Sequence, residues 1–196
     1  MAEVTAALVK KLREMTTLPM MECKAALVEA GADLEKAVEV LRKKGSIKSA
    51  KRAGREAAEG CVQCYIHTNG KVAAMVEARC ESDFVAKNEN FQRFVRDICM
   101  HIAWADPAAL DRNGLPPELV AKEKEIYADQ IKGKPANIAD KILEGKLKDF
   151  FGRVCLVDQK FVKDDKKTVA DVITEQIHKM GENIYIKRFV RFELGG

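Results

Sequence analysis

The sequence predicts an α+β protein in which an N-terminal helical module precedes an antiparallel sheet that helices cover on one side. Three observations support this fold class. Apolar residues recur at helical spacing through residues 3–45. Asn69-Gly70 separates two strand-like runs, which is the strongest short-range signal for a β-hairpin. The last part of the chain, NIYIKRFVRFEL, alternates in the way a β-strand does.

Three short helices are expected in the N-terminal module. The second begins at Pro19, because proline suits a first helical position, and ends at Gly31, which suits a C-terminal cap. Asp33 can cap the third helix, which is expected to end at Gly45. The first helix, VTAALVKKLREM, has apolar residues at helical spacing, namely Val4, Leu8, Leu12 and Met15.

A basic connector follows the module. Residues 42–55, RKKGSIKSAKRAGR, hold seven positive residues and no acidic one. Such a charge run is typical of a solvated linker, and the alternative is contact with nucleic acid or an acidic surface. No aromatic residue interrupts the charges, which argues against a base-stacking platform. The chain is therefore divided into a three-helix module over 1–45, a basic linker over 46–59 and an α+β core over 60–196.

The core is expected to alternate helices and strands after the hairpin. Phe91, Val95, Ile98 and Ile102 share one face of a helix. A loop rich in Pro, Gly, Asn and Asp follows over 103–118. The segment RVCLVDQKF has the pattern of a strand. Further helices are expected at 118–131, 136–150 and 168–179.

The final strand is expected to have apolar residues on both faces. One face would hold Ile184, Ile186, Val190 and Phe192. The other would hold Tyr185, Lys187, Phe189, Arg191 and Glu193.

The composition favours a cytoplasmic protein without a dedicated nucleic-acid surface. There are 34 basic and 30 acidic residues, and a nucleic-acid-binding domain usually has a stronger, clustered excess. The N-terminal segment is amphipathic and includes Glu3 and Glu14, unlike a signal peptide. No stretch approaches the about 20 apolar residues that a membrane span requires.

Six cysteines are scattered along the chain, and only Cys61 and Cys64 are close, with His67 just after them. This spacing suggests zinc or redox chemistry. In a strand, however, residues i and i+3 point to opposite faces, so the two thiols would diverge. We expect buried, reduced thiols and no metal site. A redox pair stays as an alternative that requires a depressed thiol pKa.

Signals for an enzyme are absent. The three histidines, His67, His101 and His178, have no nearby nucleophile and acid in the sequence, and surface or sheet-edge positions are expected for them. Neither GxxxxGK[ST] nor GxGxxG occurs. The pair Asp164-Asp165 lies in a lysine-rich segment, VKDDKK, that is typical of a solvated turn. The sequence therefore predicts a protein without catalysis or a cofactor.

Two short segments contain large side chains that suit either the core or a binding surface. Met20 and Met21 begin the second helix and suit either the core or an adaptable binding face. Asp83-Phe84 lies between a strand and a helix. Either Asp83 caps a short helix while Phe84 packs down against the chain, or Phe84 is an exposed wedge beside a carboxylate.

Several motifs occur together in one order. They are LREMT and MMECKAAL near the N-terminus, CESDFVA at residues 80–86, and FVKDD and GENIYIKRFVRFELG near the C-terminus. On these motifs the chain resembles the elongation factor Ts family, the guanine-nucleotide exchange factors for elongation factor Tu. The resemblance covers nearly the whole chain. Ser82 stands where the family usually has threonine, a change that keeps the hydroxyl.

The resemblance implies a function for the Asp-Phe segment. In the family, this pair inserts into the GTPase domain of elongation factor Tu, and the rearrangement dislodges a bound magnesium ion. Ser82, Asp83, Phe84 and Val85 would therefore contact the partner. Magnesium tolerates little geometric error, so its loss weakens GDP binding. The exchange factor and GDP then weaken each other's binding reciprocally, and GTP can rebind.

The resemblance also implies the role of the other parts. Residues 1–45 would form a ubiquitin-associated-like bundle whose Met20, Met21 and Lys24 touch the partner's GTPase domain. Longer family members have two related core halves, and this chain has a single half that a homodimer would complete through the final strand. Val190 stands where a short relative can carry a bridging cysteine, so a non-covalent dimer is expected.

The resemblance implies neither a membrane nor a specific nucleic-acid partner. An alternative function is that of an adaptor whose basic connector grips RNA or an acidic protein. RNA binding of that kind would depend steeply on salt.

Overall fold

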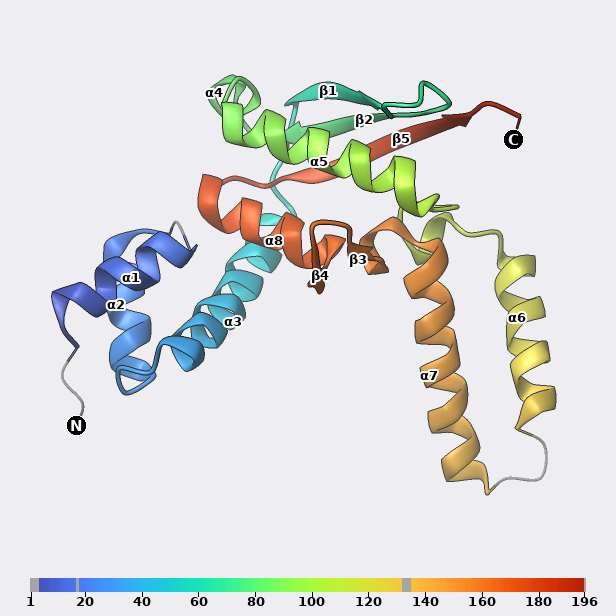
Figure 1. Ribbon diagram of the computed structural model, residues 1–196. Helices are drawn as coiled ribbons and strands as arrows, with labels where there is room; N and C mark the ends of the chain where they lie inside the picture. The colour runs from blue at the N-terminus through green and yellow to red at the C-terminus, as the bar shows by residue number, and fades with distance from the viewer. Residues whose placement is uncertain (1–3, 17, 132–134, 196) are drawn as a thin grey trace. The chain divides into compact units, whose positions relative to one another are not determined.

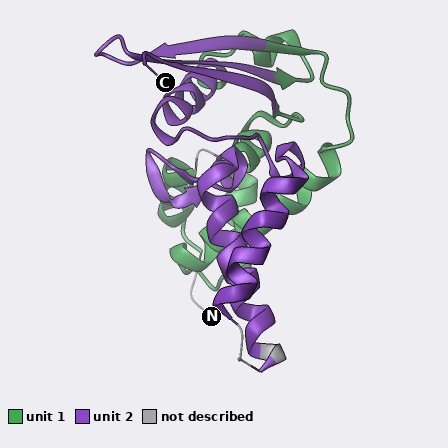
Figure 2. Ribbon diagram, turned by 90° about the vertical axis from the view of Figure 1, so that its right-hand side faces the viewer, with its two compact units in different colours: residues 1–60, 79–91, 173–185 green, residues 61–78, 92–172, 186–196 purple. Residues whose placement is uncertain are grey.

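The computed structural model describes residues 4–16, 18–131 and 135–195, which divide into two compact units (Figure 2). Unit 1 comprises residues 1–60, 79–91 and 173–185, and unit 2 comprises 61–78, 92–172 and 186–196. Helices and an antiparallel sheet are both present, which confirms the predicted α+β class. The division predicted from the sequence, into a module over 1–45, a basic linker over 46–59 and a core over 60–196, stays a prediction.

Three helices begin unit 1, as predicted: α1 (Ala6–Thr16), α2 (Met20–Glu29) and α3 (Leu34–Arg52) (Figure 1). Asp33 caps α3 as expected, since its side chain accepts hydrogen bonds from the backbone N–H groups of Glu35 and Lys36. The three helices enclose a core of their own. Its members include Val9, Leu12, Cys23, Ala26, Leu27, Ala37 and Leu41.

Helix α3 does not end at Gly45, contrary to the prediction, and it continues to Arg52. Much of the basic segment that was expected to be a linker is therefore helical. Gly45 is buried within this helix, and a Cβ placed on it would lie 3.0 Å from Nδ1 of His178. Close packing against another element, rather than helix termination, explains the glycine.

A three-stranded sheet is formed by β1 (Glu59–Ile66), β2 (Val72–Cys80) and β5 (Tyr185–Glu193) in the order β1-β2-β5. The predicted hairpin joins β1 and β2: Gly70 N–H donates to the His67 carbonyl at 2.8 Å, with Gly70 at a positive φ of 67°. Helix α5 (Glu89–Ala105) covers one face of the sheet within unit 2 (Figure 1). The thiol of Cys99 on α5 donates to the Gln63 carbonyl at 3.3 Å.

The two faces of the sheet differ in exposure. Ala74, Val76 and Ala78 are buried on the covered face. The opposite face, here called the outer face, presents large exposed apolar side chains: Val62, Ile66, Met75, Val190 and Phe192.

The predicted alternation along the final strand was wrong over its second half. Ile184 and Ile186 are buried, whereas Val190 and Phe192 are exposed. The side chains of Lys187 and Arg188 are both exposed, so the alternation of the strand shifts by one residue there. The inward positions are even-numbered before this point and odd-numbered after it. Arg191 then turns to the covered face, where its Nε donates to the Ala103 carbonyl at 3.2 Å.

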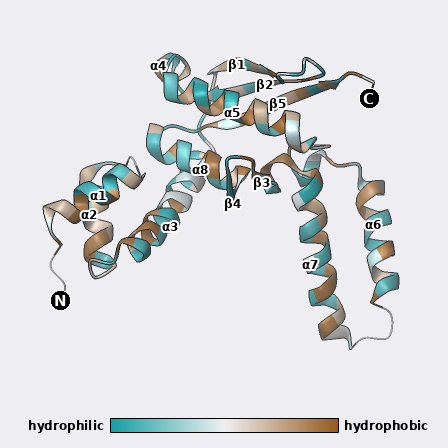
Figure 3. Ribbon diagram, in the orientation of Figure 1, coloured by the Kyte–Doolittle hydropathy of each residue, from teal (hydrophilic) through white to brown (hydrophobic). Residues whose placement is uncertain are grey.

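Unit 2 also contains a helical hairpin made of α6 (Pro117–Gln130) and α7 (Ala136–Val154). Hydrophobic and hydrophilic bands alternate along both helices (Figure 3). Tyr127 and Phe150 are buried in a small core between them. Across the described ranges, no helix is both long and apolar enough to cross a membrane.

The segment after α7 was only partly predicted. The expected strand over 153–161 is replaced by the end of α7, a short 3-10 helix (Leu156–Asp158) and the two-residue strand β3 (Lys160–Phe161). The expected turn VKDDKK includes the strand β4 (Asp164–Thr168), which pairs antiparallel with β3. Helix α8 (Val169–Met180) confirms the helix expected at 168–179.

Candidate functional site

Ser82, Asp83, Phe84 and Val85 lie where β2 passes into the one-turn helix α4 (Asp83–Ala86) in unit 1. Ser82 is in an extended conformation and caps α4, since its Oγ accepts a hydrogen bond from Val85 N–H at 3.4 Å. Serine is a preferred residue at this position because its oxygen satisfies an otherwise unpaired donor. The interpretation in which Asp83 is the cap was therefore wrong by one residue.

Phe84 does not pack down against the chain, because 83% of its surface is exposed. Of the two interpretations of this segment, the packed one is therefore wrong. The neighbouring Asp83 accepts a hydrogen bond from Lys87 Nζ at 2.8 Å, and this contact holds the pKa of Asp83 below its usual value. Val85 is half-buried and Ala86 is buried, so the far end of α4 faces the protein.

The methionines expected near the partner lie on α2. Met20 is 51% exposed and Met21 is 73% exposed, so the interpretation that at least one belongs to the core was wrong. Lys24 is exposed as well. These three side chains belong to a different element from the Asp-Phe segment, although α2 and α4 are both parts of unit 1. The buried side of α2 is formed instead by Cys23, Ala26 and Leu27.

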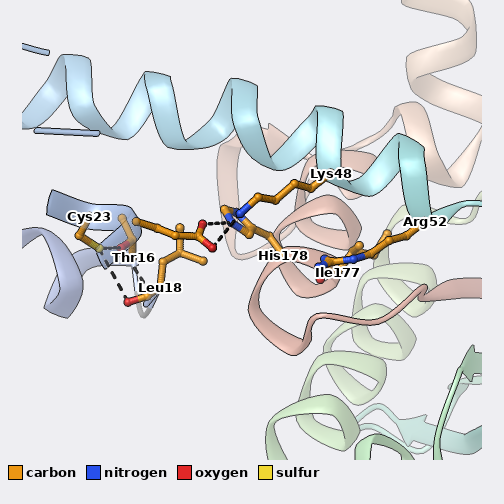
Figure 4. A network of polar contacts seen from close by, with 8 residues as sticks. Thr16, Leu18, Cys23, Lys48, Arg52, Ile177 and His178 are labelled. Atoms are coloured by element: carbon orange, nitrogen blue, oxygen red, sulfur yellow. Dashed lines mark hydrogen bonds and ion pairs between the residues drawn. The ribbon is translucent and has the colours of Figure 1, made fainter. Parts of the chain in front are cut away.

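A polar cluster joins α2 and α3 to α8 within unit 1 (Figure 4). The carboxylate of Glu22 on α2 accepts hydrogen bonds from Lys48 Nζ at 2.7 Å and from His178 Nε2 at 2.6 Å. Arg52 Nη1 donates to the Ile177 carbonyl at 3.0 Å. Burial raises the pKa of Glu22, but the hydrogen bonds from Lys48 and His178 outweigh it, so the pKa lies below its usual value.

Two carboxylates that hold the Asp-Phe segment were not predicted from the sequence. Glu182, in the turn after α8, accepts hydrogen bonds from the backbone of Glu81 and Ser82. Glu81 accepts in turn from the backbone of Asn183. The only signal for this contact was the Gly-Glu-Asn run in the last motif, which composition and periodicity do not mark as functional.

The histidines were predicted to lie at the surface or at a sheet edge, and this was wrong for two of them, which are buried on helices α5 and α8. His101 is fully buried in unit 2 and His178 is 9% exposed, whereas His67 is exposed. The Nδ1 of His101 accepts a hydrogen bond from Val162 N–H at 3.2 Å, so the proton lies on Nε2, which contacts Gln159 Oε1 at 3.0 Å. The two buried rings have structural partners.

The thiols do not form a reactive pair. All six are reduced thiols outside any disulfide; Cys64 is exposed, Cys61 is half-buried, and Cys23, Cys80, Cys99 and Cys155 are buried. Burial raises the pKa of Cys61, the opposite of what the redox alternative requires. Among the described residues, no group of three or more His, Cys, Asp and Glu is arranged to hold a metal ion.

Comparison with known proteins decides between the functions that this geometry allows. The sequence matches the family described as Elongation factor TS over residues 1–196. The chain belongs to the elongation factor Ts family. Membership makes it a translation elongation factor of the kind that exchanges the nucleotide of elongation factor Tu.

Several bacterial members of the family are similar over most of their length. The elongation factor Ts of Carboxydothermus hydrogenoformans is 52% identical over 194 residues, which cover 98% of this chain and 89% of that protein. The corresponding protein of Caldanaerobacter subterraneus subsp. tengcongensis is 50% identical, with 98% and 97% covered. That of Fervidobacterium nodosum is 49% identical over 195 residues, with 98% and 99% covered.

Proposed function

We propose that the chain binds elongation factor Tu in its GDP-bound form and promotes GDP release by inserting Asp83 and Phe84 beside the bound magnesium ion. The observation that carries this proposal is the exposure of the Phe84 ring, 83%, on a one-turn helix next to a carboxylate. An exposed aromatic side chain costs the free protein hydrophobic stabilisation, and such residues commonly anchor protein–protein contacts.

The proposed mechanism requires no covalent chemistry in this chain. Magnesium is held in a nearly ideal octahedral shell that joins phosphate and protein oxygens. A ring that moves those oxygens apart weakens the coordination, and the carboxylate of Asp83 adds negative charge near the phosphates. GDP then dissociates, and GTP can bind the nucleotide-free partner. The chain acts through binding energy alone and needs no cofactor of its own.

We propose a second contact through α2. Met20 and Met21 are flexible and polarizable, so they can adapt to an apolar surface on the partner. Lys24 is exposed on the same helix and suits an acidic group there. Because elongation factors serve the ribosome, we propose that the protein acts in the cytoplasm.

The test of this function is release of a fluorescent GDP analogue from elongation factor Tu, chased with excess GDP. The unaltered protein is expected to accelerate release at substoichiometric amounts. Phe84→Ala is expected to reduce the acceleration by a factor of about 10 or more. Trp104→Ala serves as the matched control, since Trp104 is also an exposed aromatic residue, at 71%. Equal rates for Phe84→Ala and the unaltered protein would exclude the wedge.

We further propose a non-covalent homodimer that buries the outer face of the sheet. Five large apolar side chains are exposed on this face, and soluble monomers rarely leave extended apolar surface uncovered. Phe192→Asp is expected to yield monomers in sedimentation equilibrium, because a charge would be buried without a partner. Phe84→Asp is the control and should leave the mass unchanged. A monomeric unaltered protein at micromolar concentration would contradict this assembly.

A further inference from the structure

The orientation of α4 is not explained by α4 itself. The helix is four residues long, and isolated helices of this length are not stable in water. Phe84 cannot fix the segment by packing, because it is exposed. The ion pair of Lys87 with Asp83 lies at the surface, with side chains 77% and 50% exposed, and such pairs contribute little. Other contacts must therefore hold the segment.

The carboxylate of Glu182 makes three such contacts. Its Oε2 accepts hydrogen bonds from Glu81 N–H at 3.1 Å and from Ser82 N–H at 3.0 Å. Its Oε1 accepts from the Ser82 hydroxyl, the same group that caps α4. Gly181, with φ of 78°, makes the turn that brings Glu182 away from the end of α8. Hydrogen bonds to an ionised acceptor are about twice as strong as those between neutral groups.

The same two segments exchange bonds in the opposite direction. The carboxylate of Glu81 accepts from Asn183 N–H and lies 3.6 Å from the Arg55 guanidinium. Asn183 is 4% exposed, and its Nδ2 donates to the Arg55 carbonyl at 2.8 Å. Because both segments supply donors and acceptors, neither can slide along the other without breaking several bonds.

We infer that Glu182 is a positioning residue for nucleotide exchange, and that its carboxylate fixes the direction in which Asp83 and Phe84 leave the protein surface. This inference rests on the proposed function of Phe84. Glu182 acts through Ser82, since it holds both the backbone and the hydroxyl of the residue that starts α4. A segment held in its bound orientation before contact loses less entropy on binding.

The first measurement is hydrogen exchange of the free protein, which does not depend on any partner. Glu182→Gln keeps the size of the side chain but removes its charge, which weakens the bonds from the two backbone N–H groups, and its NH2 group cannot accept from the Ser82 hydroxyl. The amides of Glu81 and Ser82 are expected to exchange faster in this variant. Glu118→Gln, a change of an exposed carboxylate on α6, is the matched control and should leave these amides unchanged.

The second measurement is a double-mutant cycle in the GDP-release assay. Glu182→Gln is expected to slow the release of GDP about 10-fold, because a small displacement of a contacting group can reduce a rate by this much. In the Phe84→Ala background the same change is expected to slow GDP release much less, because the ring is gone and only Asp83 is left to position. A Glu182→Asp variant keeps the charge on a shorter side chain. Its rate of GDP release should fall between those of the unaltered protein and Glu182→Gln.

The outcomes separate this inference from the function on which it rests. Equal slowing of GDP release by Glu182→Gln with and without Phe84 would overturn the inference, because Glu182 would then not act through the Phe84 ring. The inference would also be overturned if Glu182→Gln accelerated GDP release as well as the unaltered protein does while Phe84→Ala remained slow. The proposed wedge would then still stand. If Phe84→Ala accelerates GDP release as well as the unaltered protein does, the proposed wedge is wrong, and the positioning role of Glu182 is wrong with it.

Discussion

Gly45 lies directly against the imidazole of His178, so closely that a Cβ on Gly45 would stand 3.0 Å from Nδ1. The ring has little room to retreat, because His178 is buried and its Nε2 is bound to Glu22. The glycine in the middle of α3 therefore allows α8 to approach that helix. Substitution of glycine by alanine at this position tests how rigid the contact is.

Gly45→Ala is expected to lower the free energy of unfolding by about 1 kcal/mol. Alanine favours a helix interior over glycine by about 0.5–1 kcal/mol, but overpacking costs about 1–3 kcal/mol. Gly145→Ala on α7 is the matched control, since nothing lies within 4 Å of a Cβ there, and it should be stabilising. Denaturant titration measures both. Equal stabilisation by the two substitutions would show that the His178 ring moves freely.

Glu22→Gln is expected to lower the free energy of unfolding by about 1–2 kcal/mol, because two charge-assisted hydrogen bonds become weaker. Glu29→Gln on the same helix is the control. Glu29 also contacts a lysine, Lys44, but both of those side chains are about half exposed, so a change within about 0.5 kcal/mol is expected. A loss at position 29 as large as that at position 22 would contradict the importance of the His178 contact.

The stability of unit 2 is expected to fall as the pH is lowered below about 6.5, the usual pKa of histidine. Burial lowers the pKa of His101, so the unfolded chain binds a proton in this range that the folded chain does not. The contribution of neutral His101 to the free energy of unfolding is therefore full above the pKa of histidine in the unfolded chain, and it declines as the pH falls below that value. Protonation of Nδ1 would also break the bond from Val162 N–H.

The measurement is urea unfolding at several pH values, followed by the fluorescence of Trp104, whose ring centroid lies 6.3 Å from that of His101. Trp104 is the only tryptophan in the chain. His101→Gln removes the titrating group and is expected to flatten the profile between pH 7.5 and about 5.5. A profile of unchanged slope in this variant would assign the effect to other groups.

Cys64 is expected to react first when the folded protein is treated with a thiol reagent at about pH 8, near the usual thiol pKa. It is exposed, whereas burial raises the pKa of Cys99 to about 12 and that of Cys155 to about 11. Only the thiolate is a nucleophile. Cys64→Ser should therefore remove the fast phase, and a fast phase that persists would show that another thiol, half-buried Cys61 or a buried one, is accessible.

Elements with a local cause were predictable from the sequence. The Asn69-Gly70 turn and the Asp33 cap need only neighbouring residues, and both occur as expected. Gly45 was taken for a helix end because its reason, the contact with His178, lies far along the chain. The parity change in β5 was unpredictable for a related reason, since Arg191 contacts the carbonyl of Ala103 on another element.

In the candidate site too, features set by neighbouring residues could be predicted, whereas features set by distant residues could not. The motifs identified the segment around Phe84, but its exposure was left open, because a ring in a connecting segment can pack inward or stand free. The structure decides this point with an exposed fraction of 83%. Glu182 escaped notice because a carboxylate that accepts backbone hydrogen bonds has no periodic or compositional signature.

The contact between Ser82 and Glu182 spans 100 residues of sequence. Closing so long a loop costs conformational entropy that only later contacts repay, so pairings of this kind form late in folding. During synthesis, Asp83 and Phe84 leave the ribosome long before the carboxylate that holds them. A chain that ends before residue 182 would carry the whole CESDFVA motif without the contacts that hold it, so we expect the segment to take its orientation only after residue 182 has been synthesised.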